Sequence, residues 1–189
     1  MTVTICSLAP ADHEAVTPRL LDDAVGACFW SLERADASLS FVARGDGTAI
    51  GVILACLASA DEASPVDAGT PSEAPDVPGA DGAVLHVREL AVAAGHRRGD
   101  VATRLLLRVE REGRARGASL ALVYAWLPAG RAEPESVPFY RANGYAPHRD
   151  IPGFYGAYSL RLGAVCPYCG DPPCRCAARV LVKRLPAPA

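Results

Sequence analysis

One stretch of the sequence places basic and small residues between an expected strand and an expected helix. Residues 89–106 read E-L-A-V-A-A-G-H-R-R-G-D-V-A-T-R-L-L. The first N–H groups of a helix have no partner within the helix, and the helix dipole adds partial positive charge there. Arg97 and Arg98 add full charges that suit phosphate oxygens. The stretch therefore predicts an anion-binding site, with an ordinary strand-to-helix turn that happens to be basic as the alternative.

A second stretch lies downstream, where residues 136–145 read S-V-P-F-Y-R-A-N-G-Y. Together the two stretches resemble motifs A and B of the GNAT superfamily of N-acetyltransferases. In motif A, a strand ending in L-a-V leads through R/Q-x-x-G-x-G/A into a helix. The gap-free match is residues 97–102, with Asp100 at the first motif glycine. In motif B, N-x-x-A-x-x-F/L-Y-x-x-x-G-F, Glu133 takes the place of the asparagine and Ser136 that of the alanine.

The resemblance implies that acetyl-CoA is the acyl donor and that loop amides hold its pyrophosphate. The residues expected to contact acetyl-CoA are Ala91, Val92, Arg97, Arg98, Gly99, Asp100, Val101, Ala102, Thr103 and Ser136. The backbone N–H of Val92 is expected to polarise the thioester carbonyl, as in an oxyanion hole. The side chain of Asp100 is expected to turn outward or to cap the helix.

The resemblance also implies a general acid. In many GNAT enzymes, a tyrosine at the position of Tyr140 protonates the departing CoA thiolate. A phenol can donate a hydrogen bond to the charge that develops on sulfur, so this role is chemically reasonable. The alternative is that Tyr140 packs beside Phe139 in the core.

A general base must take a proton from the attacking ammonium before the nitrogen becomes a nucleophile. Glu89 is the first choice, because such enzymes often place a carboxylate on this strand. His86, expected on the opposite face of the same strand, and Tyr124, on the next strand, are the other candidates. In a purely structural role, Glu89 would face solvent or pair with Arg88.

The expected reaction is direct transfer, in which an amine attacks the thioester of bound acetyl-CoA without a covalent enzyme intermediate. The acceptor would be a primary amine of a peptide or small molecule, enclosed by the N-terminal helices and by residues 59–82 and 151–155. The last segment is similar to Tyr-rich segments in peptide N-terminal acetyltransferases of the ribosomal-protein kind. Asp100 and Glu133, acidic where the cofactor is anionic, favour two alternatives: a non-catalytic CoA-binding or interaction module, or a GNAT-fold transferase using another acyl donor such as an aminoacyl-tRNA.

Four cysteines near the C-terminus have the spacing C-x2-C-x4-C-x-C; they are Cys166, Cys169, Cys174 and Cys176. Four thiolates this close can complete a tetrahedral zinc site, and C-P-x-C-G resembles a zinc-knuckle turn. Such a closed site is structural, because it leaves no position for water. C-P-Y-C is also a glutaredoxin-type string, but the following G-D-P-P forbids the helix that this chemistry requires. Two disulfides or four free thiols are the remaining alternatives.

Composition limits the classes of function. At 189 residues and 19.7 kDa, with half of its residues apolar, the chain can bury the core of one domain. A net charge of −2 argues against general nucleic-acid binding. No apolar run approaches the roughly 20 residues of a membrane span, and the first residues do not resemble a secretory signal. We therefore expect a cytoplasmic protein, monomeric or homodimeric.

The order of expected elements predicts an α/β fold, and the resemblance implies a GNAT-like mixed central sheet with helices on both faces. Strands are expected over residues 2–7, 39–44, 48–58, 83–92, 118–127, 158–162 and 179–185. Helices are expected over residues 10–21, 23–34, 101–116 and 135–143. A single domain over residues 1–189 would carry an acidic mobile loop at 59–82 and a four-cysteine insertion at 163–178, between the last two strands.

Overall fold

The computed structural model describes residues 2–16, 20, 36–58, 83–163 and 165–186. Seven strands form one mixed sheet in the order β1-β2-β3-β4-β5-β7-β6. The β4–β5 pair is parallel and the other neighbours are antiparallel. The strands are β1 (Val3–Ser7), β2 (Phe41–Gly45), β3 (Thr48–Ala58), β4 (Ala83–Val92), β5 (Ala118–Leu127), β6 (Ala146–Ile151) and β7 (Ala177–Arg184).

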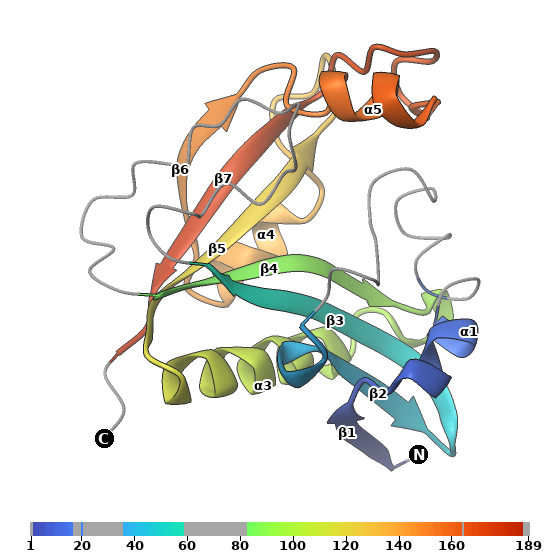
Figure 1. Ribbon diagram of the computed structural model, residues 1–189, viewed down its shortest axis with the longest axis vertical. Helices are drawn as coiled ribbons and strands as arrows, with labels where there is room; N and C mark the ends of the chain where they lie inside the picture. Colours follow the sequence, from blue (N-terminus) through green and yellow to red (C-terminus); the bar gives the residue numbers. More distant parts are fainter. Residues whose placement is uncertain (1, 17–19, 21–35, 59–82, 164, 187–189) are drawn as a thin grey trace.

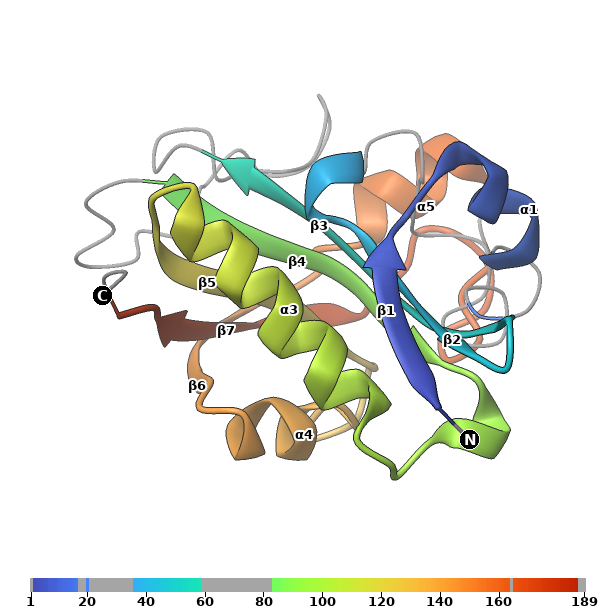
Figure 2. The same ribbon diagram turned by 90° about the horizontal axis from the view of Figure 1, so that it is seen from below.

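Helices lie on both faces of this sheet. The helices are α1 (His13–Val16), α3 (Val101–Ala115), α4 (Val137–Ala142) and α5 (Gly156–Leu162), and the 3-10 turns are η1 (Pro10–Asp12), η4 (Ala37–Leu39) and η5 (Ala94–His96). α3 packs across one face, whereas Val16 of α1 joins a cluster on the other face with Val52 and Leu54 of β3. Figure 2 shows α3 lying along the sheet.

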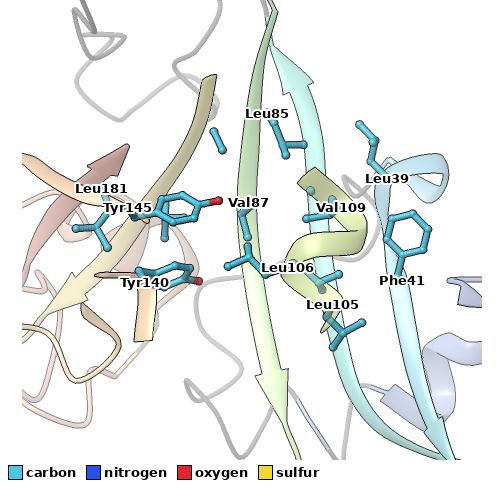
Figure 3. Packing of buried hydrophobic residues seen from close by; sticks show 14 of the residues in the cluster. Leu39, Phe41, Leu85, Val87, Leu105, Leu106, Val109, Tyr140, Tyr145 and Leu181 are labelled. Carbon is cyan, nitrogen blue, oxygen red and sulfur yellow. The ribbon is translucent and has the colours of Figure 1, made fainter. Parts of the chain in front are cut away.

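The main core forms between α3 and the sheet because the apolar residues of α3 recur at helical spacing. Leu105, Leu106 and Val109 are fully buried and contact Leu85 and Val87 of β4 in the same cluster. Figure 3 shows this packing, with the two tyrosines of the α4 region on the other side of β4 from η4 and β2. One core therefore joins β4, α3 and α4.

The structure confirms most of the expected elements and corrects one. Residues 158–162, expected as a strand because apolar residues alternate there, belong to helix α5. The strand before the cysteines is instead β6, which pairs with β7 at the edge of the described sheet. The cysteines still lie between the last two strands of the sequence, β6 and β7. The expected helix at 23–34, the loop at 59–82 and part of the helix at 10–21 lie outside the described residues.

Candidate active site

β4 and β5 pair over only part of their length. The parallel ladder joins Ala83 to Ala118 and ends where Val87 pairs with Val123. Beyond this point the strands diverge: β4 continues with β3, β2 and β1, whereas β5 continues with β7 and β6 (Figure 1). The second half of each strand therefore borders the place where the sheet opens.

A β-bulge at Arg88 sets the direction of the residues that follow it on β4. Glu89 pairs with Leu54 of β3 and His86 pairs with Cys56, so Arg88 is one extra residue on β4. Directly paired residues share a face, and Leu54 and Cys56 are two residues apart. Glu89 and His86 therefore lie on the same face. The expectation that they lie on opposite faces is wrong, because it assumed unbroken alternation.

Glu89 is half-buried at the opening between β4 and β5. Burial raises the pKa of its carboxyl to about 8, against a smaller opposing effect from the charge of Arg88. Its negative charge in turn contributes to the raised pKa values of Tyr140 and Tyr155. The carboxyl group of Glu89 thus lies within electrostatic reach of two phenols from different elements.

Tyr140 lies on α4 and is 6% exposed. Its ring makes edge-to-face contacts with Phe139 and Tyr145, with centroids 5.1 Å and 5.3 Å apart. Figure 3 shows the ring of Tyr140, on α4, and the ring of Tyr145, which follows α4, on the same side of β4. Burial, followed by the charge of Glu89, raises the pKa of Tyr140 above its ordinary value. Tyr140 is therefore both a core residue and a protonated phenol near the opening.

The start of α3 presents free amides, as the sequence predicts. The first N–H that bonds within the helix is that of Arg104, which donates to the carbonyl oxygen of Asp100 at 2.8 Å. The amides of Val101, Ala102 and Thr103 consequently have no partner within the helix. Arg98 adopts a left-handed backbone conformation with φ of 64°, which is uncommon outside glycine and concentrates at functional turns.

A glycine allows this end of α3 to approach β3. A Cβ on Gly51 would lie 3.0 Å from Cγ1 of Val101 and 3.1 Å from Cδ1 of Leu105. A larger residue would push the first turn of α3 away from the sheet. The small residue on β3 therefore keeps the free amides close to the end of β4.

The backbone of Val92 faces the opening. The N–H of the next residue, Ala93, donates to Ile50 of β3 at 3.0 Å, and the N–H groups of an antiparallel strand alternate in direction. The carbonyl oxygen of Val92 accepts a hydrogen bond from Nε of Arg97 at 2.9 Å instead of from a strand. Since the N–H and C=O of one strand residue point the same way, the N–H of Val92 also faces away from β3.

A row of aromatic rings crosses the opening on the Glu89 face. The ring of His86 meets Tyr124 edge-on at 5.2 Å, and Tyr124 stacks on Phe154 at 4.9 Å. Phe154 in turn contacts Tyr155 edge-on at 5.0 Å. Burial raises the pKa of Tyr124 to about 12. Burial, followed by the charge of Arg88, lowers the pKa of His86 to about 3.

The four cysteines gather at one point between α5 and β7. Their Sγ atoms all lie within 4.8 Å of one another, and no disulfide joins any of the four. Sγ of Cys169 lies 3.5 Å from that of Cys174 and 3.9 Å from that of Cys176, and the Cys166–Cys176 distance is 3.7 Å. A tetrahedral zinc ion with bonds of about 2.3 Å separates its sulfur ligands by about 3.8 Å. The donor set therefore fits one such ion.

The first cysteine pair sits on a tight turn. The N–H of Cys166 donates to the carbonyl of Gly170 at 2.9 Å, and the reverse bond has the same length. Gly170 has φ of 77°, a conformation that glycine adopts without a steric cost. This is the backbone geometry that the C-P-x-C-G string predicts. We call residues 166–176 the cysteine knuckle.

The combination of a diverging β4–β5 pair, free amides at α3 and Tyr140 on α4 matches the resemblance noted in the sequence. The sequence profile of the Acetyltransferase (GNAT) family matches residues 4–145, three quarters of the chain. The chain belongs to this family. No curated protein sequence matches the chain significantly.

Solved structures of other GNAT proteins have the same fold. Naa20 of Chaetomium thermophilum, in complex with a bisubstrate analogue, is 20% identical with a TM-score of 0.63, covering 98% of this chain and 87% of its own. The ribosomal-protein-S18-alanine N-acetyltransferase of Escherichia coli is 15% identical (TM-score 0.61; 100% and 96% covered). A nourseothricin acetyltransferase is 16% identical (TM-score 0.60; 98% and 100% covered). Identities this low show a shared fold.

Both acidic departures from the GNAT motifs have cationic partners. Asp100 does not cap α3: its side chain is 70% exposed and lies 3.8 Å from Nη1 of Arg104. Glu133 lies 2.8 Å from Arg141 and 3.8 Å from Arg179. Ser136, the remaining motif B position, is the N-cap of α4. The charge that each carboxylate would present to an anionic cofactor is therefore partly neutralised.

One polar cluster near this GNAT site was not expected from the sequence. The hydroxyl of Tyr145 donates to Glu110 of α3 at 3.0 Å, and Nζ of Lys183 lies 2.6 Å from the same carboxylate. Glu110 is only 5% exposed, so the ion pair ties α3 to β7 inside the molecule. The one available signal was Tyr145 itself, since motif B usually has phenylalanine there.

No helix among the described residues could cross a membrane. The longest of them is α3, and it is neither long nor apolar enough.

Proposed function

We propose that this GNAT protein transfers an acetyl group from acetyl-CoA to a primary amine of a peptide or small molecule by direct attack. The observation that carries the proposal is the opening between β4 and β5, with Glu89 on one side and Tyr140 on the other. In the reaction, the amine nitrogen bonds to the thioester carbon and the carbon–sulfur bond breaks. Glu89 takes a proton from nitrogen, and Tyr140 gives one to sulfur.

On the donor side, we infer that the free amides at residues 101–103 hold the pyrophosphate of acetyl-CoA. Arg97 and Arg98 are exposed beside them, and the pairing of Asp100 with Arg104 reduces the repulsion there. The N–H of Val92 would donate to the thioester oxygen as negative charge develops on it. The raised pKa of Tyr140 suits a general acid, because the phenol remains protonated at neutral pH.

On the acceptor side, the pKa values favour Glu89 over the other two candidate bases. A base with a pKa of about 8 is matched to an amine that titrates near the same value. His86, with a pKa of about 3, is too weak a base, and Tyr124, with a pKa of about 12, remains protonated. Both residues are better suited to shaping the acceptor side of the opening.

The E. coli neighbour acts, by its name, on an alanine of a ribosomal protein, and the nourseothricin acetyltransferase on a small molecule. We favour a peptide α-amine, because the rings of Tyr124, Phe154 and Tyr155 give the described part of the acceptor side an aromatic surface. A cytoplasmic location, where thiols stay reduced, also suits the four free cysteines.

We further propose that the cysteine knuckle holds one structural zinc ion through Cys166, Cys169, Cys174 and Cys176. The spacing of the sulfur atoms supports this, and so does the burial of three of the four cysteines. When bound, the ion would join the two cysteine pairs and supply no chemistry to the transfer.

The test is acetylation of three sets of acceptors by purified protein with acetyl-CoA, followed by mass spectrometry. The first set is short peptides with free N-termini, the second is the same peptides blocked at the N-terminus but containing lysine, and the third is small aminoglycosides and polyamines. We expect acetylation in the first set. Acetylation confined to the third set would overturn the peptide assignment, and acetylation in none would overturn the proposed enzyme.

A further inference from the structure

The cysteine knuckle packs directly on α5. The backbone N–H of Cys174 donates to Oγ of Ser159 at 2.7 Å, and this hydroxyl donates to the carbonyl of Gly156 at 2.8 Å. Ser159 is fully buried. A Cβ on Gly156 would lie 3.2 Å from the carbonyl oxygen of Cys174, so the two backbones meet closely. The position of Cys174 therefore fixes the position of the first turns of α5.

The residues just before α5 reach the opening between β4 and β5. Tyr155 is the N-cap residue of α5, and its ring packs against the cysteines and lies edge-on to Trp126 of β5 at 6.2 Å. The same ring meets Phe154 edge-on at 5.0 Å, and Phe154 stacks on Tyr124 of β5 at 4.9 Å. The ring of Tyr155 thus lies between the knuckle and the aromatic row at the opening.

We propose that the metal-bound knuckle positions the acceptor side of the active site. Ser159 is the positioning residue, because its hydroxyl connects the knuckle to α5. Cys174 is at once a candidate metal ligand and the donor to Ser159, which lies one helical turn after Tyr155. The metal therefore sets the place of Tyr155 and, through the stacked pair of Phe154 and Tyr124, of the aromatic row. This inference rests on the proposed acetyl transfer and names a role for the metal in acceptor binding.

The donor side is independent of this chain of contacts. α3, which carries the candidate pyrophosphate site, packs against β2, β3, β4 and β5, and α5 lies at the far end of β5 and β7 (Figure 1). Disturbing the contact between the knuckle and α5 should consequently weaken acceptor binding and leave acetyl-CoA binding unchanged. A merely structural knuckle would weaken both or neither.

Two variants disturb this contact by different means. Ser159→Ala removes the acceptor for the Cys174 N–H, and Gly156→Ala places a methyl group against the Cys174 carbonyl. Alanine has a higher helix propensity than glycine, so this substitution alone should not loosen α5. Any loosening of α5 in Gly156→Ala would therefore come from the disturbed contact with the Cys174 carbonyl. Ser119→Ala is the matched control, because the Ser119 hydroxyl is buried without a hydrogen-bond partner among the described residues.

The experiment compares zinc-loaded wild type and the three variants. It measures amide hydrogen exchange in residues 156–163 and 101–115, acetyl-CoA affinity by calorimetry, and KM for the most rapidly acetylated peptide of the first acceptor set. In both contact variants we expect faster exchange only in α5 and a peptide KM raised by about tenfold, because Ser159→Ala leaves the buried Cys174 N–H without its acceptor and Gly156→Ala crowds the Cys174 carbonyl. Zinc content and acetyl-CoA affinity should match wild type, and the control should match it throughout.

Unchanged exchange in α5, or faster exchange with an unchanged peptide KM, would overturn the inference. A parallel loss of acetyl-CoA affinity would also overturn it, because the effect would then be general. Failure of the proposed function is a separate result, seen in wild type as the absence of any acetylated peptide. Removing zinc from wild type provides an independent check, since exchange should again accelerate in α5 and not in α3.

Discussion

Glu89 and His86 lie on the same face of β4, although three residues separate their positions in the sequence. The bulge at Arg88 reverses the alternation, so that Glu89 pairs with Leu54 while His86 pairs with Cys56. Leu90 and Val92 then pack against the core on the α3 side, and Glu89 lies on the same face as His86, the first ring of the aromatic row. One extra residue in a strand thereby places a candidate base on the acceptor side of the site.

The Tyr140→Phe variant tests the proposed general acid. We expect kcat to fall by about 10²–10⁴-fold with little change in KM, because the hydroxyl would act only on the leaving sulfur. Steady-state kinetics with saturating acetyl-CoA measure both constants. Tyr145→Phe is the control, since it removes a neighbouring buried hydroxyl that bonds to Glu110. Full turnover in Tyr140→Phe would leave this tyrosine a packing residue.

The Asp100→Asn variant tests the candidate pyrophosphate site. Removing one exposed negative charge beside the free amides of α3 should strengthen acetyl-CoA binding by about two- to fivefold at low salt. Calorimetric titration measures the Kd, and the gain should shrink as ionic strength rises. Asp171→Asn, in the exposed part of the knuckle, removes an equal charge elsewhere. Binding in Asp100→Asn no stronger than in Asp171→Asn would place the pyrophosphate away from this turn.

Metal analysis tests the knuckle. Protein purified under reducing conditions should contain one zinc per chain, and Cys174→Ser should lose it. Cys6→Ser, which removes an exposed cysteine outside the cluster, should keep it. Metal-free wild type, or two intact disulfides by mass spectrometry, would contradict the assignment.

The Lys183→Met variant tests the buried ion pair. It leaves the Glu110 carboxylate without its cation, so we expect the free energy of unfolding to fall by about 3 kcal/mol. The double variant Glu110→Gln/Lys183→Met should recover most of this loss, because no buried charge remains. Urea denaturation at neutral pH measures each value. Arg111→Met replaces an exposed cation on α3 and should change the free energy of unfolding little. A loss in Arg111→Met equal to that in Lys183→Met would show that the ion pair has no special role.

The elements that the sequence predicts well are the central strands and α3. β3, β4 and β5 are buried on both faces, and they have the expected bounds because they are apolar runs. The apolar residues of α3 recur at helical spacing, and this helix ends one residue earlier than expected. β6 contains proline, histidine and two charged residues in six positions, and it lies at the edge, so it has no such pattern. The sequence predicts a strand where α5 lies, because the helix is stabilised by contacts with the knuckle that no local pattern in α5 reveals.

The sequence predicts the parts of the site whose backbone is specified by a motif. It predicts less well the parts whose side-chain directions depend on how two strands pair. The free amides at α3 and the buried Tyr140 follow from motifs A and B. The bulge at Arg88 is visible only in the register between β3 and β4, which no local pattern in β4 reveals. The packing of Tyr155 against both the knuckle and Phe154 likewise depends on the place of α5.

The pH dependence of turnover in Glu89→Gln tests the central claim most directly. With one peptide acceptor, wild-type kcat/KM should rise between about pH 6 and pH 10 through two ionisations, that of Glu89 near 8 and that of the peptide amine. Glu89→Gln should lose about 10²–10⁴-fold in kcat/KM and keep only the amine ionisation. Glu112→Gln, which removes a carboxylate paired with Arg108 on α3, should behave as wild type. A Glu89→Gln variant with the wild-type rate and profile would contradict the assignment of Glu89 as the base.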